Sequence, residues 1–465
     1  MYQAYVTKLK NLRKHPNADR LLLGDCFGNT VCVSTDYTED VIGVYFPTDG
    51  QLSVEFAEYN NLLRKKDDAG NNIGGYMDPD KRNVTAIRLR GEKSDGLFLP
   101  ISCLDFCFND GAAKHLNVGD TIDTVNGHLI CEKYIPRAKN SGPARAGNRT
   151  RKAKTPIAPL FAEHADTEQL AYNLNAFKAG DLVEITLKMH GTSQRTAYLP
   201  VFKGYNDTWA MKVGNAFCKV LSKVTKKDYS RHERHGAPIY EDGYISGTRR
   251  VVLENYDAGY YGSNEFREQH SKLFEGKLWK GETVYYEVVG FTTTGAPIMG
   301  DASNAKLNDK DFVKQYGPIT RFSYGCAPGT SDCYVYRMTM TNPDGQVVEY
   351  TPDFMRYRCE QMGVKTVPVL WTGCIPETIQ LPDMNSYEIN PGDYVTNVAE
   401  RYFDGPDPIG KTHVREGVVV RIINRPKFTA YKHKNFSFKV LEGIIKASAE
   451  TPDMEEAQEV EEDTE

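Results

Sequence analysis

The 465-residue chain lacks the patterns that define several common classes of protein. Its ten cysteines are scattered and form no CxxC pair, so neither a zinc site nor a disulfide framework is indicated. No apolar run approaches the roughly 20 residues that a membrane helix needs, and the opening MYQAYVTKLK does not have the composition of a secretory signal. We therefore expect a globular, cytoplasmic protein with reduced cysteines.

Charge of one sign is missing from two segments. Residues 450–465 hold nine acidic and no basic residues, and we expect the tail, taken as 447–465, to be disordered because it cannot bury a core. Residues 133–154 hold eight Lys or Arg and no carboxylate. Their Pro, Gly and Ser content predicts a linker over 133–159, and their charge suits contact with a phosphate backbone. A linker that is only solvated has the same composition.

The linker predicts two folded parts, since a chain of this length exceeds one ordinary core. Over 1–132, short alternating runs such as VCVSTDY and VTAIRLRG are separated by turn residues, which is typical of a small all-β barrel or sandwich. Over 160–446, strands alternate with helices, and the NPDG turn in YVYRMTMTNPDGQVVEYT joins neighbouring antiparallel strands. This second part is predicted to be an α+β domain built on antiparallel sheets.

Residues 188–195, KMHGTSQR, are the first candidate for a functional site. Lys188 follows the apolar run VEITL directly, so a predicted strand ends on a lysine, and Gly191 and two hydroxyl residues follow. A single lysine before a glycine usually decorates a turn. If Lys188 attacks a nucleotide phosphorus, however, it must lose its proton, and nearby cations and a metal would favour the neutral amine. Residues of matching chemistry should therefore follow along the chain.

Three later residues meet that requirement. Lys439 lies in FSFKVL, expected to be a short β-type run, and a second lysine would neutralise the attacked phosphate. Glu416 opens the strand-like segment REGVVVRI and offers the hard oxygen ligand that Mg²⁺ prefers. Glu287 lies within the apolar strand VYYEVVG, where a carboxylate is costly unless something pairs with it. A strand whose polar face meets water is the alternative for Glu287.

These segments resemble those of a known superfamily. KMHGTS, SGTRR, VYYEVVG, VYRMT, REGVVVR and SFKVL, in this order, look like motifs I, Ia, III, IIIa, IV and V of the covalent nucleotidyltransferases, which include ATP-dependent ligases and mRNA capping enzymes. The His-Gly-Thr-Ser form of the first motif, with HADTEQL upstream, is most similar to RNA ligases. The resemblance covers most of residues 160–445.

The resemblance implies a role for each candidate. Lys188 would be the adenylylated nucleophile, Glu416 the metal-binding carboxylate, and Lys439 the lysine that contacts the α-phosphate. The implied cofactors are ATP and Mg²⁺ or Mn²⁺. Among residues that bind the nucleotide, the resemblance further implies Glu287 and Arg249.

Glu287 would contact the ribose or a metal-bound water, and Arg249 the ribose or the RNA 5′-phosphate, if the resemblance holds. Tyr336 is the candidate for stacking on adenine. Tyr334 is its alternative, because strand register decides which of the two faces the pocket.

The chain departs from the superfamily pattern at two positions. His190 stands where KxDG has Asp, and either a substrate role or a turn-stabilising hydrogen bond fits it. Ser437 stands where motif V often has the first of two lysines. Lys432 and Lys434 either compensate for this serine or are surface charges. HADTEQL, residues 164–170, likewise either contacts adenine or substrate or forms a helix capping box.

Domain order selects among relatives of this superfamily. DNA ligases and capping enzymes typically carry an OB barrel after motif V, but only 26 residues follow Lys439. KHPNADRLLLGDC and IRLRGEKSDGLFLP, in the first part, look instead like the OB-fold of tRNA-binding modules; a turn in which Asn17 and Asp19 bond their own backbone is the alternative. An OB-like barrel over 1–132 ahead of a nucleotidyltransferase domain over 160–446 resembles the fifth family of RNA ligases.

The resulting hypothesis is an ATP-dependent RNA ligase with a role in RNA repair. It would join RNA 3′-OH and 5′-phosphate ends, in RNA or an RNA-containing duplex, through lysyl-AMP and RNA-adenylate intermediates. Two alternatives stay open: a GTP-dependent guanylyltransferase that uses the same lysine, and a non-catalytic OB-fold protein that binds RNA.

Overall fold

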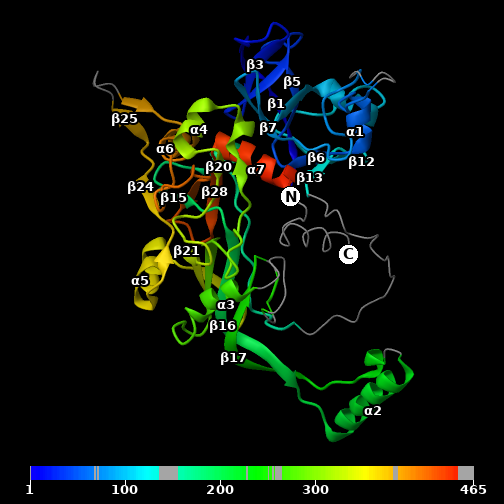
Figure 1. The fold of residues 1–465 in the computed structure, drawn as a ribbon, viewed down its shortest axis with the longest axis vertical. Coiled ribbons are helices and arrows are strands. Elements are labelled where there is room, and N and C mark those ends of the chain that lie inside the picture. The colour runs from blue at the N-terminus through cyan, green and yellow to red at the C-terminus, as the bar shows by residue number, and fades with distance from the viewer. Residues whose placement is uncertain are drawn as a thin grey trace.

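A computed structural model describes residues 2–66, 70, 73–135, 156–226, 229–249, 251–253, 256, 264–380 and 386–448. The predicted basic linker lies almost entirely outside the described residues, as does the predicted acidic tail beyond Ser448. The described chain is a mixed α+β structure in which sheets predominate (Figure 1).

The first part of the chain consists mainly of short strands. Its strands and helix are β1 (Ala4–Lys8), β2 (Lys10–Lys14), β3 (Leu21–Cys26), β4 (Asn29–Ser34), β5 (Ile42–Phe46), β6 (Gly50–Leu52), α1 (Val54–Tyr59), β7 (Ala86–Leu89), β8 (Glu92–Asp95), β9 (Leu97–Pro100), β10 (Thr121–Ile122), β11 (Thr124–Val125), β12 (His128–Leu129) and β13 (Cys131–Lys133). They pair as β10-β1-β5-β9, β2-β3-β4, β7-β8, β6-β13 and β11-β12. Over the described residues these sheets do not join into a closed barrel, so the predicted OB barrel is not confirmed.

The two signature segments of this part contact each other. His15 Nε2 donates to the carbonyl oxygen of Leu89 at 3.0 Å, and Asn17 Nδ2 donates to that of Arg90 at 2.9 Å. Asn17 therefore bonds across to the second segment, where the sequence suggested a bond within its own turn. HPNAD and RGEKSDG form one local structure around the β7–β8 hairpin.

The second part carries the longer elements. They are β14 (Glu168–Gln169), β15 (Leu182–Lys188), β16 (Thr192–Tyr205), α2 (Trp209–Thr225), β17 (Pro238–Gly247), α3 (Glu265–Lys272), β18 (Glu282–Gly290), β19 (Ala302–Ser303), α4 (Lys310–Tyr316), β20 (Ile319–Thr320), β21 (Ser331–Thr341), β22 (Val347–Glu349), α5 (Pro352–Met362), β23 (Lys365–Thr366), β24 (Val369–Cys374), β25 (Thr378–Gln380), β26 (Ser386–Glu388), α6 (Pro391–Glu400), β27 (Gly417–Ile422), β28 (Thr429–Lys434) and α7 (Phe436–Ser448).

Two sheets organise this part. One has the order β14-β28-β27-β15-β24, and the other β17-β16-β18-β21-β22 with β23 beside β21. Only β14–β28 and β21–β23 are parallel among the pairs of these two sheets in the described chain, so the predicted antiparallel character is confirmed. The NPDG hairpin between β21 and β22 is also confirmed, as is the helix that ends at Gly363 with φ 70°. The chain crosses from the first sheet to the second at residues 189–191.

One local prediction was wrong, and one alternative is excluded. The FSFKVL segment begins helix α7 and is not a β-type run, because Asn435 Oδ1 accepts the backbone N–H groups of Ser437 at 2.7 Å and Phe438 at 3.3 Å and so caps a helix. The helix extends to Ser448, two residues beyond the predicted end of the domain. HADTEQL does not form a capping box: Asp166 pairs with Arg249, and the segment ends in strand β14.

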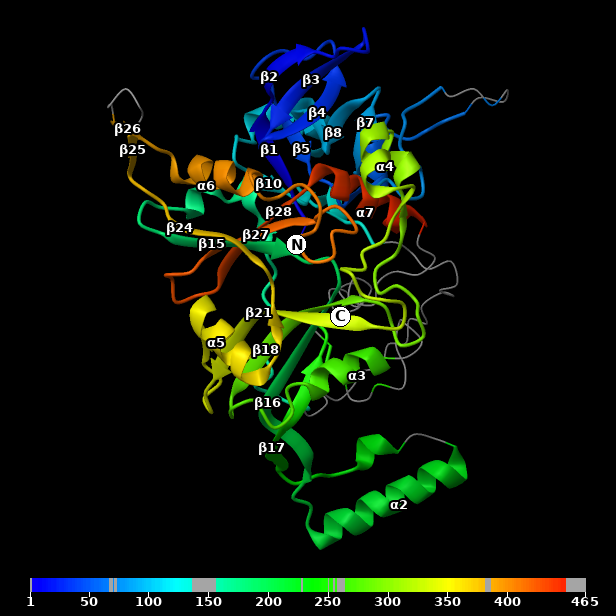
Figure 2. The same ribbon diagram turned by 60° about the vertical axis from the view of Figure 1, so that its left-hand side comes forward.

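Helix α7 lies between the two parts of the chain (Figures 1 and 2). Its Phe438 and Leu441 are buried in a core that also contains Ala86 of β7 and Leu187 of β15. The long β16–β17 hairpin extends from the second sheet and holds α2 at the end of the molecule farthest from the first part (Figures 1 and 2). Within the described chain, no helix is long and apolar enough to cross a membrane.

Candidate functional site

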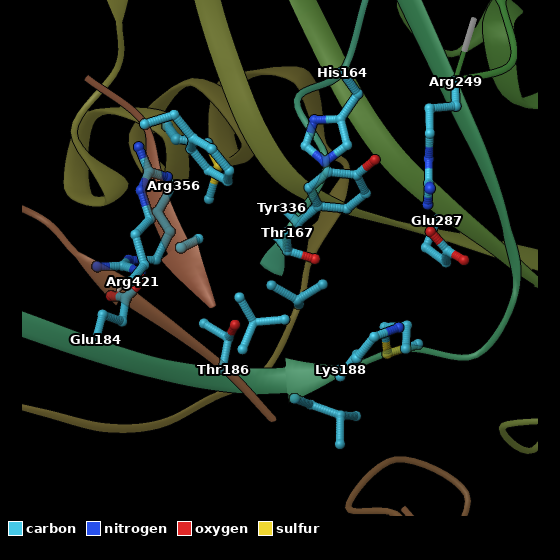
Figure 3. A pocket seen from close by; sticks show the side chains of 17 residues that line it. His164, Thr167, Glu184, Thr186, Lys188, Arg249, Glu287, Tyr336, Arg356 and Arg421 are labelled. Carbon is cyan, nitrogen blue, oxygen red and sulfur yellow. Dashed lines mark hydrogen bonds and ion pairs between the residues drawn. The ribbon is translucent and has the colours of Figure 1, made fainter. Parts of the chain in front are cut away.

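A pocket opens between the two sheets of the second part (Figure 3). It encloses about 820 Å³ of space, part of it open to solvent, which is in the range of small-molecule sites. The lining comes from β15, β18, β21, β27, β28, α5, the segment before β14 and the residues that adjoin β15, β17, β23 and β28: His164, Thr167, Glu184, Thr186, Leu187, Lys188, Met189, Arg249, Glu287, Tyr336, Met355, Arg356, Val367, Val419, Arg421, Phe428 and Ala430.

Lys188 is the last residue of β15 and faces this pocket. It pairs in register with Gly417, the first residue of β27, and this pairing brings the preceding Glu416 beside it. Lys188 Nζ lies 2.7 Å from Glu416 Oε1, and the Glu416 side chain is 2% exposed. The neighbouring strands thus hold a buried carboxylate against a lysine that lines the pocket.

Gly191 allows the crossing between the sheets. A Cβ atom at this position would lie 2.3 Å from the carbonyl oxygen of Val288, so only glycine permits β16 to approach β18 here. The Gly191 N–H donates to Glu287 Oε1 at 3.1 Å. Glu287 therefore supports the turn after Lys188 from the facing strand, and its place in the middle of β18 has a physical reason.

His190 is buried under the same turn. Its backbone N–H donates to the hydroxyl of Tyr324 at 2.6 Å, and its ring packs edge-on against Phe322 and Phe438 with centroids 4.6 and 4.7 Å away. Burial lowers the pKa of His190 to about 4, so the ring is neutral at pH 7. Its Nδ1 lies 3.8 Å from Glu416 Oε2. The backbone of His190 thus makes the hydrogen bond at this turn, and its ring lies among aromatic side chains beside Glu416.

Lys432 and Lys434 lie beside this group. The β27–β28 register places Lys434 opposite Gly417 and Lys432 opposite Val419, and the two lysines share a face with Ala430 of the pocket lining. Lys434 Nζ is 3.5 Å from Glu416 Oε1 and 2.7 Å from Glu442 Oε2.

Lys432 is the more perturbed of the two lysines. Burial, followed by the charges of Lys434 and Lys188, lowers the pKa of Lys432 to about 8. Lys188 and Lys434 thus both contact Glu416, and Lys432 feels the charge of both lysines. Motif V often has two lysines that are two residues apart, and this chain has Ser437 at the first of those positions. Lys432 and Lys434 have the same spacing and lie on β28, the strand that precedes Ser437.

Glu416 suits a divalent cation. Among the described residues, its buried Oε2 has no hydrogen-bond partner, so one carboxylate oxygen can accept a ligand. The described residues contain no cluster of three or more His, Cys, Asp or Glu that would form a complete protein cage. One carboxylate with water and phosphate oxygens completing the shell fits Mg²⁺ or Mn²⁺ bound together with a nucleotide.

An aromatic wall faces the lysine (Figure 3). Tyr336 lines the pocket, and its hydroxyl lies 2.9 Å from Ser193 Oγ. Val335 and Arg337 pair with consecutive residues of β18, so Tyr336 is the extra residue of a β-bulge that turns it toward the pocket. Tyr334, the alternative, does not line the pocket and is buried in the core with Leu187.

His164 extends this wall. Its ring contacts Tyr336 edge-on at 5.0 Å, and its Nδ1 lies 3.2 Å from Arg337 Nη1. Burial and the charge of Arg337 hold the pKa of His164 well below its usual range, so Nδ1 accepts that hydrogen bond in the neutral ring. Arg249 lies at the same edge, paired with Asp166 at 3.0 Å, and extends toward Glu287 in Figure 3.

The pocket floor, away from Lys188, is charged (Figure 3). Glu184 Oε2 lies 2.7 Å from Arg356 Nη1, and Arg421 Nη2 donates to the carbonyl oxygen of Tyr350 at 3.1 Å. Sequence reasoning did not select these residues. The signal was available, because Glu184 lies in the apolar strand VEITL, where an unpaired carboxylate would be costly.

Lys439 lies elsewhere. It projects from α7 toward the first part of the chain, with Nζ 2.6 Å from Asp95 Oδ2 and 3.5 Å from Asn29 Oδ1. It is not among the residues that line the pocket. The structure thus brings together Lys188, Glu287 and Glu416, with Arg249 and Tyr336 on the pocket wall, and places Lys439 at the contact between the two parts.

The site is thus a lysine at the end of a strand, beside a pocket between two sheets. Comparison with solved structures finds RNA ligase of Naegleria gruberi. A variant of that enzyme with ATP and Mn aligns over 94% of this chain and 98% of its own at 16% identity, with a TM-score of 0.51. A complex of the ligase with PPi aligns over 94% and 97% at 17% identity, with a TM-score of 0.50.

Comparison of the sequence with family models finds no match, and the same holds for curated proteins. At 16 to 17% identity, the structural likeness shows the fold. The chain has the fold of this RNA ligase.

Proposed function

We propose that this protein is an ATP-dependent RNA ligase that joins RNA 3′-OH and 5′-phosphate ends through lysyl-AMP and RNA-adenylate. One observation carries the proposal: Lys188 Nζ, 2.7 Å from the buried Glu416, opens on a pocket with Tyr336 on its wall. The fold shared with an RNA ligase supports it. A degenerate, purely RNA-binding protein would have no need to keep this group together.

In the first step, Lys188 becomes adenylylated. Its neutral Nζ attacks the α-phosphorus of ATP, a P–N bond forms, and the bond from that phosphorus to the pyrophosphate oxygen breaks. Glu416 Oε1 lies at hydrogen-bond distance and can accept the proton that Lys188 loses. A divalent cation held at Glu416 would neutralise phosphate charge.

The next two steps move AMP and then release it. An oxygen of the RNA 5′-phosphate attacks the phosphorus of lysyl-AMP, the P–N bond breaks, and Lys188 regains its proton. The RNA 3′-hydroxyl, losing its proton, then attacks the activated 5′-phosphate, and AMP leaves. Each step is a displacement at phosphorus, in which positioning and positive charge supply most of the rate.

Lys432 and Lys434 are the phosphate-binding lysines in this proposal. They share the pocket-side face of β28, and Lys434 lies beside Glu416, whereas Lys439 pairs with Asp95. Arg249 is placed to contact the ribose or the RNA 5′-phosphate. Tyr336 stacks on the adenine, with Val419 of β27 lining the same pocket.

The decisive experiment measures transfer of the labelled nucleotide from ATP or GTP to the protein. The full-length protein, freed of AMP, is incubated with Mg²⁺ and α-labelled ATP or GTP, and label that survives denaturation is mapped. We expect attachment from ATP at Lys188. Attachment from GTP alone would make the protein a guanylyltransferase, and no attachment from either nucleotide would overturn the proposal.

A bypass test separates the steps. Lys188→Ala should form no labelled protein and join no 5′-phosphate ends with ATP, yet it should still join chemically pre-adenylated RNA, because that substrate enters after the lysine has acted. Lys188→Arg keeps the positive charge and serves as the matched control, since it should also form no label. A Lys188→Ala protein that joins strands with ATP as its only AMP source would contradict the mechanism.

We also propose that the protein is cytoplasmic and that it acts in RNA repair. Nicked RNA-containing duplexes and single-stranded RNA ends, offered in parallel to the same preparation, would identify the preferred polynucleotide. DNA duplexes serve as the control in that comparison.

A further inference from the structure

Helix α2 presents an apolar stripe to solvent at the end of the β16–β17 hairpin (Figures 1 and 2). Its members recur every three or four residues and therefore share one face: Trp209, Val213, Phe217, Val220 and Val224. They are between 48% and 80% exposed. Five large apolar side chains on one exposed helix face mark an interaction surface, because single exposed apolar residues are normal but contiguous ones are not.

The opposite face of α2 explains how the helix is held. Asn215 exchanges two hydrogen bonds with the backbone of Arg234, at 2.8 and 2.9 Å, and Ser222 Oγ accepts from the backbone N–H of Tyr229 at 3.1 Å. Asn215 and Ser222 are seven residues apart and lie on one side of the helix. The returning chain thus covers the inner side of α2 and leaves the apolar stripe outward.

Positive charge borders the stripe on one side. Residues 208–226 contain Lys212, Lys219, Lys223 and Lys226 and no Asp or Glu. The first three recur at helical spacing beside the apolar residues, so the surface offers apolar side chains next to ammonium groups. An occupant must therefore be apolar and anionic at once.

We propose that α2 binds an anionic lipid surface, with its apolar stripe at the boundary of the acyl chains and its lysines among the phosphate headgroups. This combination of a Trp and Phe on one face with lysines beside them is the pattern of helices that lie in a membrane interface. The hairpin holds α2 at the far end of the molecule, so a flat surface can meet the helix without meeting either sheet (Figures 1 and 2).

Other occupants fit less well. A helix of 17 residues is about 25 Å long and about 10 Å wide, so two copies packed face to face would bury only about 500 Å² in total, well below stable interfaces. In an antiparallel pair the lysine borders would also face each other. RNA would engage the lysines but leave the five apolar side chains in water.

Vesicle binding by the full-length protein tests the proposal. The probes are vesicles of phosphatidylcholine with phosphatidylserine at about 7:3, and vesicles of phosphatidylcholine alone. We expect co-sedimentation with the anionic vesicles only, weakened by salt because screening reduces the lysine contribution. Trp209→Ser with Phe217→Ser, and separately Lys219→Glu with Lys223→Glu, should each weaken vesicle binding about tenfold or more.

The matched control is Val347→Ser with Val348→Ser, which removes two exposed valines from β22 and should not change vesicle binding. Lysyl-AMP formation reports folding of every variant and should be unchanged by those in α2. Failure of the wild-type protein to co-sediment, or equal binding by Trp209→Ser with Phe217→Ser, overturns the proposal. The proposal is likewise overturned if the wild-type protein does not bind vesicles and the Trp209→Ser, Phe217→Ser variant loses RNA binding or self-association.

Discussion

Helices α2 and α7 begin alike and end in opposite environments. Each follows a capping residue, Thr208 for α2 and Asn435 for α7, whose side chain accepts backbone N–H groups of the first turn. Each carries apolar residues at helical spacing. Phe438 of α7 is fully buried, however, whereas Phe217 of α2 is 63% exposed.

The difference lies in what surrounds α7. Arg88 and Lys93 of the first part lie over the ring of Phe436 at 5.6 and 5.3 Å, and Lys439 pairs with Asp95. On its other side, Phe438 packs against His190 beside the candidate nucleophile. Helix α7 thus joins the first part of the chain to the site, and its apolar face is used within the molecule.

The comparison teaches that an amphipathic pattern predicts a helix and a face, but not the partner of that face. For α7 the partner is the protein's own core, and loss of contact should cost stability and activity. For α2 the inner contacts are polar and local, and loss of the outer side chains should cost neither. Four sets of substitutions test this contrast between the two helices.

The largest expected effect is on catalysis. Glu416→Gln keeps the shape of the side chain that contacts Lys188 but removes its charge, so adenylylation should slow about 100-fold or more. Single-turnover label transfer from ATP measures the rate. Lys219→Gln, which removes a charge from α2, is the control and should leave the rate unchanged; a similar loss in both variants would erase the contrast.

Phe438→Ala should cost the most stability. Deleting a buried phenylalanine removes apolar burial and leaves a cavity, so the free energy of unfolding should fall by about 3–5 kcal/mol. Phe217→Ala, the same substitution on the exposed stripe, should change it by less than about 0.5 kcal/mol. Urea unfolding of both variants gives the two values, and equal losses would contradict the burial of α7.

A charge exchange between Lys439 and Asp95 separates two roles for the lysine. Lys439→Ala or Asp95→Ala alone leaves a largely buried charge without its partner and should cost about 1.5–3 kcal/mol. The exchange, Lys439→Asp with Asp95→Lys, should recover both stability and label transfer if the pair only fastens α7 to the first part. Recovered stability without label transfer would instead assign Lys439 to the α-phosphate.

The smallest effect concerns pH. Burial lowers the pKa of His433, on the strand that leads into α7, to about 4, whereas the unfolded chain titrates near 6.5. Between these values the unfolded state binds more protons, so the free energy of unfolding falls as pH falls. His433→Gln should remove at most about 1.4 kcal/mol per pH unit from that dependence. Urea unfolding from pH 4 to 7 checks the slope, and an unchanged slope would show that other groups carry it.

Much of the site was predictable because its residues occupy local positions. Lys188 at the end of an apolar strand and Glu287 within one are visible as polar residues at costly places. The helical nature of α7 was also readable, since Asn435 can cap a helix and the apolar residues after Lys439 recur at helical spacing. The alternation in FSFKV is also typical of a strand, but it spans too few residues to distinguish a strand from a helix.

Other features required the third dimension. The bulge that turns Tyr336 to the pocket depends on how β21 pairs with β18, which no local pattern announces. The link between Asp166 and Arg249 joins segments 83 residues apart. The pairing of the short strands in the first part likewise replaced the expected closed barrel.

The sequence alone indicated that Lys188 ends a strand, that Gly191 follows it closely, and that Glu416 lies at the start of a later strand. Each of these features depends only on residues that are adjacent along the chain. The tertiary structure decided which cations meet Glu416. The register of β27 against β28 brings Lys434 to it, and the packing of α7 against the first part turns Lys439 toward Asp95. Long-range pairing and helix rotation arise from packing between distant segments, so no single segment encodes them.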